Sequence, residues 1–215
     1  GTANSLIGSS VAEVLVGGTL NDTFSGNGGA DTLDGGAGND RFAYTFAAEE
    51  ESGESVTGGG GTGDRLSLAG DSYDLTGVAM TGVELLAFGS PTASATLKSS
   101  QLGGAGDIAT VVGGSGVNSL IVVPNSLLAG QTITLAGVVF QSWTSGVDRI
   151  TVRGSTLGDH LTGSGQDDTL DGLAGADTLL GGNGNDVLAG GAGADSLQGG
   201  AGTGDALDYG ASGAG

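Results

Sequence analysis

The chain repeats itself every nine residues in two separate blocks. Residues 17–43 hold three copies (GGTLNDTFS, GNGGADTLD and GGAGNDRFA), and residues 163–198 hold four (GSGQDDTLD, GLAGADTLL, GGNGNDVLA and GGAGADSLQ). Every copy opens with Gly, carries Asp at its sixth place and a large apolar residue at its eighth. A short, strict period of this kind predicts a solenoid, because one repeat buries little apolar surface alone and gains its core by stacking on its neighbours.

Each repeat divides into a turn and a short strand. The glycines permit the positive φ and the close backbone approach that a tight turn requires. The three residues after the Asp are expected to form a strand whose central apolar residue, such as Leu170 or Leu179, points inward. Its neighbours, such as Thr169 and Thr178, are small or polar and are expected to point outward. The pattern therefore predicts an all-β fold.

The sixth-place acids form two ladders along the chain. The first contains Asp22, Asp31 and Asp40, and the second contains Asp159, Asp168, Asp177, Asp186 and Asp195, followed after ten residues by Asp205. Stacked β-strands lie about 4.8 Å apart, and two carboxylates at that separation repel by about 0.9 kcal/mol in bulk water. The repulsion grows where the dielectric constant is lower, so the ladders oppose folding unless a cation lies between the rungs.

Composition favours calcium as that cation. The chain has 24 acidic and 5 basic residues, and its net charge of −19 disfavours nucleic acid and anionic membranes as partners. Calcium takes six to eight oxygen ligands and accepts carbonyls beside carboxylates, whereas magnesium requires stricter octahedral geometry. Zinc prefers His and Cys, of which the chain has one and none. No apolar run approaches the roughly 18 residues needed to cross a bilayer, so we expect no membrane insertion.

The repeats resemble the repeat-in-toxin (RTX) nonapeptide family of calcium-binding bacterial proteins that are exported by type I secretion. The match is most specific in residues 163–198, and residues 154–162 (GSTLGDHLT) look like a weaker copy. The resemblance implies a right-handed parallel β-roll in which two repeats make one coil turn, so that repeats eighteen residues apart stack. It would place Asp159, Asp177 and Asp195 on one side of the roll and Asp168, Asp186 and Asp205 on the other.

The resemblance also implies which atoms hold each ion between stacked turns. The earlier turn supplies the carbonyls of its second and fourth residues and its Asp, and the later turn supplies the carbonyls of its first and third residues and its Asp. The four sites that this predicts consist of Ser164, Gln166, Asp168, Gly181, Asn183 and Asp186; of Leu173, Gly175, Asp177, Gly190, Ala192 and Asp195; of Ser155, Leu157, Asp159, Gly172, Ala174 and Asp177; and of Gly18, Leu20, Asp22, Gly35, Ala37 and Asp40. The expected total is roughly four to seven ions of this coordination type.

Three positions depart from the pattern. Glu13 and Asn4 stand where an Asp would pair with Asp31 and Asp22, respectively. One extra residue precedes Asp205 and changes its carbonyl partners. The alternative to metal binding at all these places is an Asp that caps its own glycine turn through local hydrogen bonds.

The nine-residue frame divides the chain into a first calcium-binding block (1–43), a central segment (44–153), a second calcium-binding block (154–210) and a tail (211–215). The central segment lacks the frame but contains short strand-like runs at 64–68, 83–88, 119–123, 132–135 and 149–152. We expect a calcium-free continuation of the β-solenoid that rests on apolar ladders. A small inserted β-sandwich is the alternative.

Few other residues suggest chemistry. Glu49, Glu50, Glu51 and Glu54 are interpreted as a solvated loop in preference to another cation site. Trp143 is expected to be buried, with a sugar-stacking surface as the alternative. His160 is the single His and is expected on the surface, without the partners that a catalytic triad or zinc site needs.

The sequence predicts a protein that is not itself an enzyme. We expect a calcium-dependent structural module of a secreted or cell-surface bacterial protein such as an adhesin, an S-layer protein or a toxin. One alternative is the accessory C-terminal region of an extracellular metalloprotease or polysaccharide-modifying enzyme whose catalytic domain lies outside this chain. Another is a module that binds a cell-surface glycan or surface protein through its central segment.

Overall fold

A computed structural model describes residues 1–45, 53–103 and 108–210. They fold into parallel β-sheets joined by turns, with two short 3-10 helices, η2 (Leu75–Gly77) and η3 (Ser99–Gln101). The chain forms two compact units: an N-terminal unit of residues 1–95, 101–118 and 139–143, and a C-terminal unit of residues 96–100, 119–138 and 144–215. None of the helices in these described ranges has the length and apolar character needed to cross a membrane.

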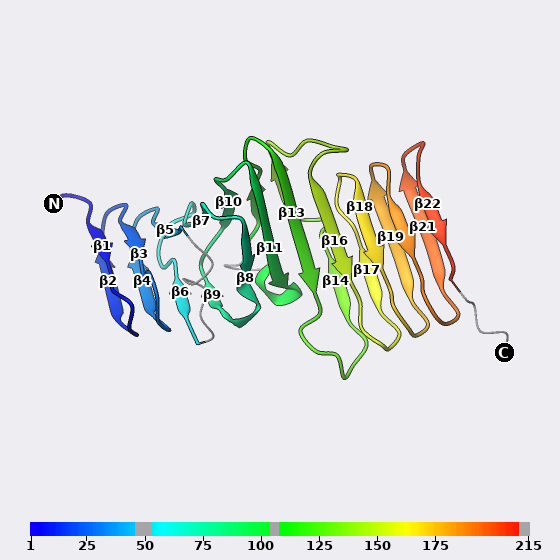
Figure 1. Cartoon of the computed structure of the whole chain (residues 1–215), viewed down its shortest axis with the longest axis horizontal. Coiled ribbons are helices and arrows are strands. Elements are labelled where there is room, and N and C mark those ends of the chain that lie inside the picture. Colours follow the sequence, from blue (N-terminus) through cyan, green and yellow to red (C-terminus); the bar gives the residue numbers. More distant parts are fainter. Residues whose placement is uncertain (46–52, 104–107, 211–215) are drawn as a thin grey trace. The chain divides into compact units, whose positions relative to one another are not determined.

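The N-terminal unit is built from two parallel sheets (Figure 1). The first has the order β1 (Ser5–Ile7), β3 (Thr23–Ser25), β5 (Arg41–Tyr44), β7 (Arg65–Leu68), β10 (Leu85–Phe88), β12 (Thr110–Val112) and β15 (Val139–Gln141). The second has the order β2 (Val14–Gly18), β4 (Thr32–Gly36), β6 (Ser55–Thr57) and β9 (Ala79–Thr81). Strand β8 (Ser72–Asp74) precedes η2. Strand β11 (Thr92–Lys98) begins in this unit and ends in the other.

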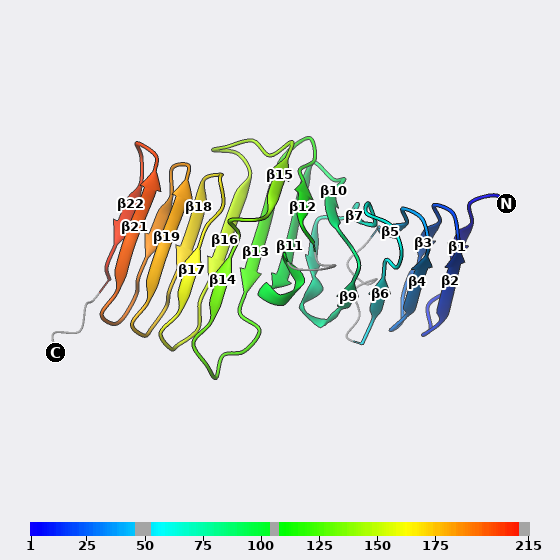
Figure 2. The same ribbon diagram turned by 180° about the vertical axis from the view of Figure 1, so that it is seen from behind.

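The C-terminal unit repeats this plan (Figure 2). One row of parallel strands contains β13 (Val117–Val123, of which residues 119–123 belong to this unit), β16 (Arg149–Arg153), β18 (Asp168–Asp171), β20 (Val187–Ala189) and β22 (Ala206–Asp208). The other contains β14 (Thr132–Thr134), β17 (His160–Thr162), β19 (Thr178–Asn183) and β21 (Ser196–Ala201). In the second block, strands eighteen residues apart pair in register, as Leu161 does with Leu179 and Leu179 with Leu197.

The eighth-place residues form the core. Phe24, Phe42 and Leu66 stack along the first sheet of the N-terminal unit, and each is fully buried. The rings of Phe24 and Phe42 are stacked with centroids 5.0 Å apart. Leu161, Leu170, Leu179 and Leu188 are fully buried in the C-terminal unit. Complete burial of such a side chain contributes about 1.5–3 kcal/mol, which explains why the apolar residue recurs as strictly as the Asp.

The predicted all-β parallel solenoid is confirmed, and it continues through the central segment. The five predicted runs contain or overlap β7, β10, β13, β14 and β16. Because β7 pairs in parallel with β5, and β16 with β18, the central strands extend the repeat sheets and do not form an inserted sandwich. The coil turns here are longer: Asp40 and Asp64 occupy neighbouring rungs although they are 24 residues apart. These insertions conceal the period in the sequence without interrupting the stacking.

Candidate metal sites

A hydrogen-bonded ladder joins the sixth-place acids of successive turns. In each step the backbone N–H of one acid donates to the Oδ1 of the acid on the next turn. The donor–acceptor distances are 2.6 Å from Asp22 to Asp40, 2.7 Å from Asp159 to Asp177, 2.9 Å from Asp168 to Asp186, 3.0 Å from Asp177 to Asp195 and 3.0 Å from Asp186 to Asp205. The Oδ1 atom of each carboxylate is therefore held by the neighbouring turn, along the solenoid axis. The Oδ2 atom is directed into the turn to which the Asp belongs.

That second oxygen meets a backbone carbonyl of the next turn. At Gly172, a Cβ atom would lie 2.5 Å from Asp177 Oδ2 and 2.7 Å from the carbonyl oxygen of Gly190. We call this arrangement an oxygen cradle: the Oδ2 of one repeat and the first carbonyl of the next turn, both facing the first Gly of the repeat. Cradles of this form occur at Gly17 (Asp22 and Gly35), Gly154 (Asp159 and Gly172), Gly163 (Asp168 and Gly181), Gly172 (Asp177 and Gly190) and Gly181 (Asp186 and Gly199). Any side chain at the first place would enter the cradle, which explains the invariance of Gly there.

Several carboxylates of the ladders are buried without full compensation, whereas the Oδ2 atoms of Asp22, Asp159 and Asp168 each accept a backbone N–H of their own turn. The Oδ2 atoms of Asp40, Asp177, Asp186 and Asp195 are inaccessible to solvent and have no hydrogen-bond partner. Burial raises the pKa of Asp168 to about 7, and burial, with a smaller contribution from neighbouring acids, also raises the pKa values of Asp177 and Asp186. A buried charge of this kind is costly unless it is paired or coordinates a metal. The residues present thus fit a hard cation.

Carbonyl oxygens must supply most of the ligands. Within residues 1–45, 53–103 and 108–210, no three carboxylate or imidazole groups gather where a metal ion could bind. Each cradle offers carboxylate and carbonyl oxygens in the mixture that calcium accepts. When bound, calcium would supply the positive charge that offsets the repulsion between successive carboxylates.

The remaining predicted ligands lie in the same turns. The second-place carbonyls of Gly18 and Leu173 accept the N–H groups of Ala37 and Ala192, both at 2.8 Å, and the carbonyl of Ser164 accepts the N–H of Asn183 at 3.4 Å. The fourth-place carbonyls of Leu20, Leu157, Gln166 and Gly175 each face the fourth-place Gly of the next turn. Ala174 and Ala192 form a bridge between turns, and Ser155 donates its N–H to Asp159 Oδ2 at 2.5 Å. A carbonyl oxygen has two lone pairs, so one inter-turn hydrogen bond leaves a position for a cation.

The departures from the repeat pattern differ in their geometry. Glu13 donates its N–H to Asp31 Oδ1 at 2.9 Å, and its own Oε2 faces the carbonyl of Gly26 across Gly8, as an Asp would. Asn4 donates its N–H to Asp22 Oδ1 but brings no second carboxylate. The extra residue before Asp205 is absorbed within the turn, since Asp205 still accepts the N–H of Asp186.

Among the other candidate residues, the prediction that Glu54 belongs to a solvated loop is wrong. Glu54 is 1% exposed and accepts the hydroxyl of Tyr44 at 2.6 Å, so it faces the interior and is not part of a solvated loop. Glu49, Glu50 and Glu51 lie outside the described residues. Trp143 is half-buried between Phe88 and Phe140, with ring centroids 5.9 and 5.2 Å away. His160 is exposed on β17.

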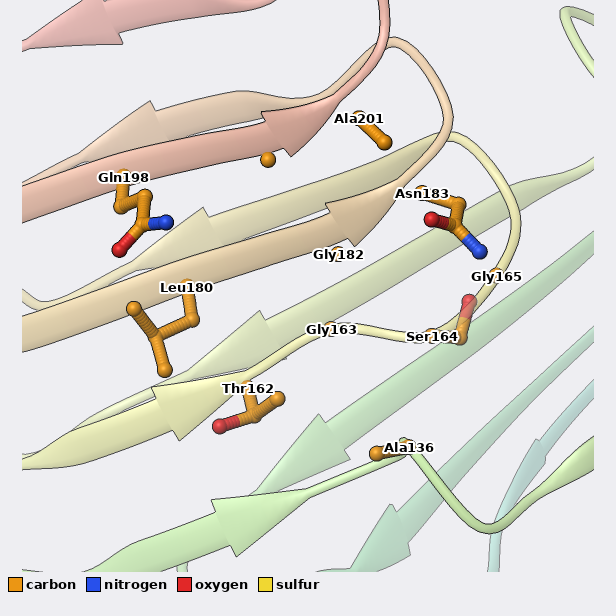
Figure 3. A pocket seen from close by; sticks show the side chains of 11 residues that line it. Ala136, Thr162, Gly163, Ser164, Gly165, Leu180, Gly182, Asn183, Gln198 and Ala201 are labelled. Carbon is orange, nitrogen blue, oxygen red and sulfur yellow. The ribbon is translucent and has the colours of Figure 1, made fainter.

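An open groove of about 490 Å³ lies on the outer face of the C-terminal unit (Figure 3). Its walls include Thr162, Leu180 and Gln198 from three adjacent strands, with Asn183 at the end of β19 and Ser164 from a turn. Its lining contains no acidic residue, although Gly163, Ser164 and Asn183 at its edge also belong to a cradle turn or a predicted cation site.

A parallel β-solenoid with rows of buried carboxylate and carbonyl oxygens is typical of a class of protein that binds hard cations between its turns. Residues 7–42, 153–188 and 180–203 match the model of the RTX calcium-binding nonapeptide repeat, in four copies. The matched residues lie in the two repeat blocks, which are therefore similar to the calcium-binding repeats of the RTX family. No curated protein and no solved structure gives a significant match to the chain.

Replacement of Gly163 by Ala is expected to weaken calcium binding at its cradle at least tenfold. The new methyl group would lie under 3.0 Å from both Asp168 Oδ2 and the Gly181 carbonyl oxygen, so one of these oxygens must leave its place. Gly165→Ala is the matched control, because a Cβ atom at Gly165 meets nothing within 4 Å and the residue has no positive φ. Calcium titrations followed by calorimetry should separate the two variants. Equal affinities would show that this cradle does not bind the ion.

Proposed function

We propose that this chain is a calcium-dependent folding module of an extracellular bacterial protein. The observation that carries the proposal is the repeated oxygen cradle, in which buried carboxylate oxygens such as Asp177 Oδ2 and Asp186 Oδ2 lack a hydrogen-bond partner. Before calcium binds, these charges oppose the stacking of the rungs; after it binds, the same charges hold the rungs together. Binding free energy then becomes folding free energy.

An extracellular location follows from this coupling as part of the proposal. Extracellular calcium modules bind the ion at about 10⁻⁴–10⁻³ M. A chain that folds only in that range would stay unfolded where calcium is scarce, during synthesis and export, and would fold after release. The family match supports this assignment because the repeats are those of secreted bacterial proteins of the RTX type.

The proposed role is structural and not catalytic. The chain's single His is exposed on β17, and most of the buried acids belong to the ladders that the repeats build. We therefore assign the module the task of presenting a rigid, calcium-dependent scaffold. Any enzyme activity of a larger protein would lie in a separate domain.

The direct test is calcium binding by the isolated chain, measured by equilibrium dialysis and calorimetry. We expect roughly four to seven ions per chain, with little competition from magnesium at equal concentration because magnesium requires octahedral geometry. Binding of one ion or none, or equal binding of magnesium, would contradict the proposal.

A double variant, Asp177→Asn with Asp186→Asn, tests the ladders themselves. Both residues lie in the middle of a row and contact the turns on either side. Their replacement is therefore expected to lower the affinity for several calcium ions at least tenfold. Asp71→Asn with Asp74→Asn is the control, because it removes the same charge from two exposed positions. If this control variant weakened calcium binding equally, the effect would be due to net charge and not to the ladders.

A further inference from the structure

The first acid ladder does not end where the repeats end. The N–H of Asp40 donates to Asp64 Oδ1 at 2.6 Å, so Asp64 occupies the next rung after Asp40. Asp64 belongs to residues 58–66 (GGGGTGDRL) of the central segment, beyond the residues 7–42 that match the repeat family. This stretch has the spacing of residues 199–207 (GGAGTGDAL), which carry Asp205 after the same extra residue.

The two stretches stack on their preceding turns in the same way. Thr62 donates its N–H to Asn39 Oδ1 at 3.2 Å, and Thr203 donates its N–H to Asn185 Oδ1 at 3.3 Å. The Asp40–Asp64 step likewise corresponds to the 3.0 Å step from Asp186 to Asp205. The turn at residues 58–64 is therefore a repeat turn in its bonding, although the sequence frame around it is lost.

An oxygen cradle also forms at this step. A Cβ atom at Gly35 would lie under 3.0 Å from both Asp40 Oδ2 and the carbonyl oxygen of Gly58, as it would at Gly181 from Asp186 Oδ2 and the Gly199 carbonyl. Asp40 is 1% exposed and Asp64 is 0% exposed, and the Oδ2 atom of each has no hydrogen-bond partner. Asp40 Oδ2 is thus an unpartnered buried oxygen directed into the cradle.

We propose that Asp40, Asp64 and the carbonyl of Gly58 form an additional calcium site that extends the N-terminal ion row into the central segment. The site rests on the proposed function, since it uses the same oxygen chemistry, and it differs from the expectation of a calcium-free centre at this rung. Burial, with smaller contributions from Glu84 and Asp40, raises the pKa of Asp64, which agrees with a carboxylate that lacks a counter-ion. The ion would tie β5 and the first block to β7.

The test is the calcium stoichiometry of an Asp64→Asn variant, measured by native mass spectrometry. Asn retains an oxygen that can accept the Asp40 N–H, and it replaces the charged second oxygen by an uncharged NH2 group. At free calcium that just saturates the unaltered chain, the variant is expected to hold one ion fewer, because that ion binds at least tenfold more weakly. Asp71→Asn, an exposed position with the same charge change, is expected to keep the full number.

A second measurement needs no variant. Anomalous scattering from crystals of the unaltered chain grown in calcium should show an ion about 2.3–2.6 Å from Asp40 Oδ2 and the Gly58 carbonyl oxygen. Ions in the cradles of the repeat blocks, but none between Asp40 and Asp64, would overturn this site and leave the proposed function intact. A chain that binds no calcium at all would overturn both.

Discussion

In excess chelator, the chain is expected to lose most of its β circular-dichroism signal and to regain it cooperatively when calcium is restored. The expectation follows from the seven sixth-place acids that are at most 3% exposed: Asp22, Asp31, Asp40, Asp159, Asp168, Asp177 and Asp186. Moving a charged carboxylate from water into the protein interior costs several kcal/mol, even after the protein has relaxed around it. Domains of ordinary stability have only about 5–15 kcal/mol to lose.

Calcium reverses this balance by mass action. Each site contributes about 2.7 kcal/mol when free calcium exceeds its dissociation constant a hundredfold, so a few sites together match the stability of a whole domain. The transition should be cooperative because each inner acid contacts the turns on both sides, as Asp177 does with Asp159 and Asp195.

The measurement is a calcium titration from chelator, followed by circular dichroism. Magnesium at the same ionic strength is the control, since it screens charge without satisfying the oxygen geometry, and it should restore little structure. A complete β spectrum in chelator would show that the apolar ladders of Phe42, Leu66, Leu170 and Leu188 suffice for folding.

Mild acid is expected to substitute in part for calcium. In the calcium-free chain, acidification from pH 7.5 to pH 5 should increase the β signal, because buried carboxyls that gain a proton no longer repel one another. Burial raises the pKa of Asp168 from 3.8 to about 7. The pKa values of Asp40, Asp64, Asp177 and Asp186 are also raised, again chiefly by burial.

The sign of the pH effect follows from proton linkage. An Asp in the unfolded chain has a pKa near 3.8, whereas that of Asp168 in the folded chain is about 7. At pH values between these two, the folded state holds a proton that the unfolded state has released. Stability of the calcium-free chain therefore falls as the pH rises through this window, by up to about 1.4 kcal/mol per pH unit for each such group. Calcium affinity changes in the opposite direction, since the ion must displace these protons, and binding should release them.

The β circular-dichroism signal at several pH values from 5 to 7.5, with calcium removed beforehand, gives the folded fraction and from it the slope of stability against pH. Asp168→Asn is expected to make the slope shallower because it removes a carboxyl whose pKa is raised to about 7. Asp71→Asn, which is exposed, should leave the slope unchanged. A calcium-free chain that becomes more stable as the pH rises would contradict the linkage.

The sequence alone determined the repeating part of this protein. The interval of nine residues places an Asp and a large apolar residue at the same two positions of every repeat, as Asp177 and Leu179 show. The backbone conformation is therefore expected to repeat wherever this spacing does. The strands of the second block and the inward apolar ladder could be predicted for this reason, and the resemblance to the RTX family implied the stacking of residues eighteen apart. The family match falls on the same residues.

Only the tertiary structure decided which residues meet across the longer coil turns. Asp64 lies 24 residues after Asp40 yet occupies the next rung, because the parallel pairing of β5 with β7 sets its neighbour and the inserted residues do not. Glu54 was expected in a solvated loop, but the packing around Tyr44 brings its side chain into the interior. Sequence spacing determines contacts where coil turns have equal length; where their lengths vary, the register of the sheet determines which oxygens come together.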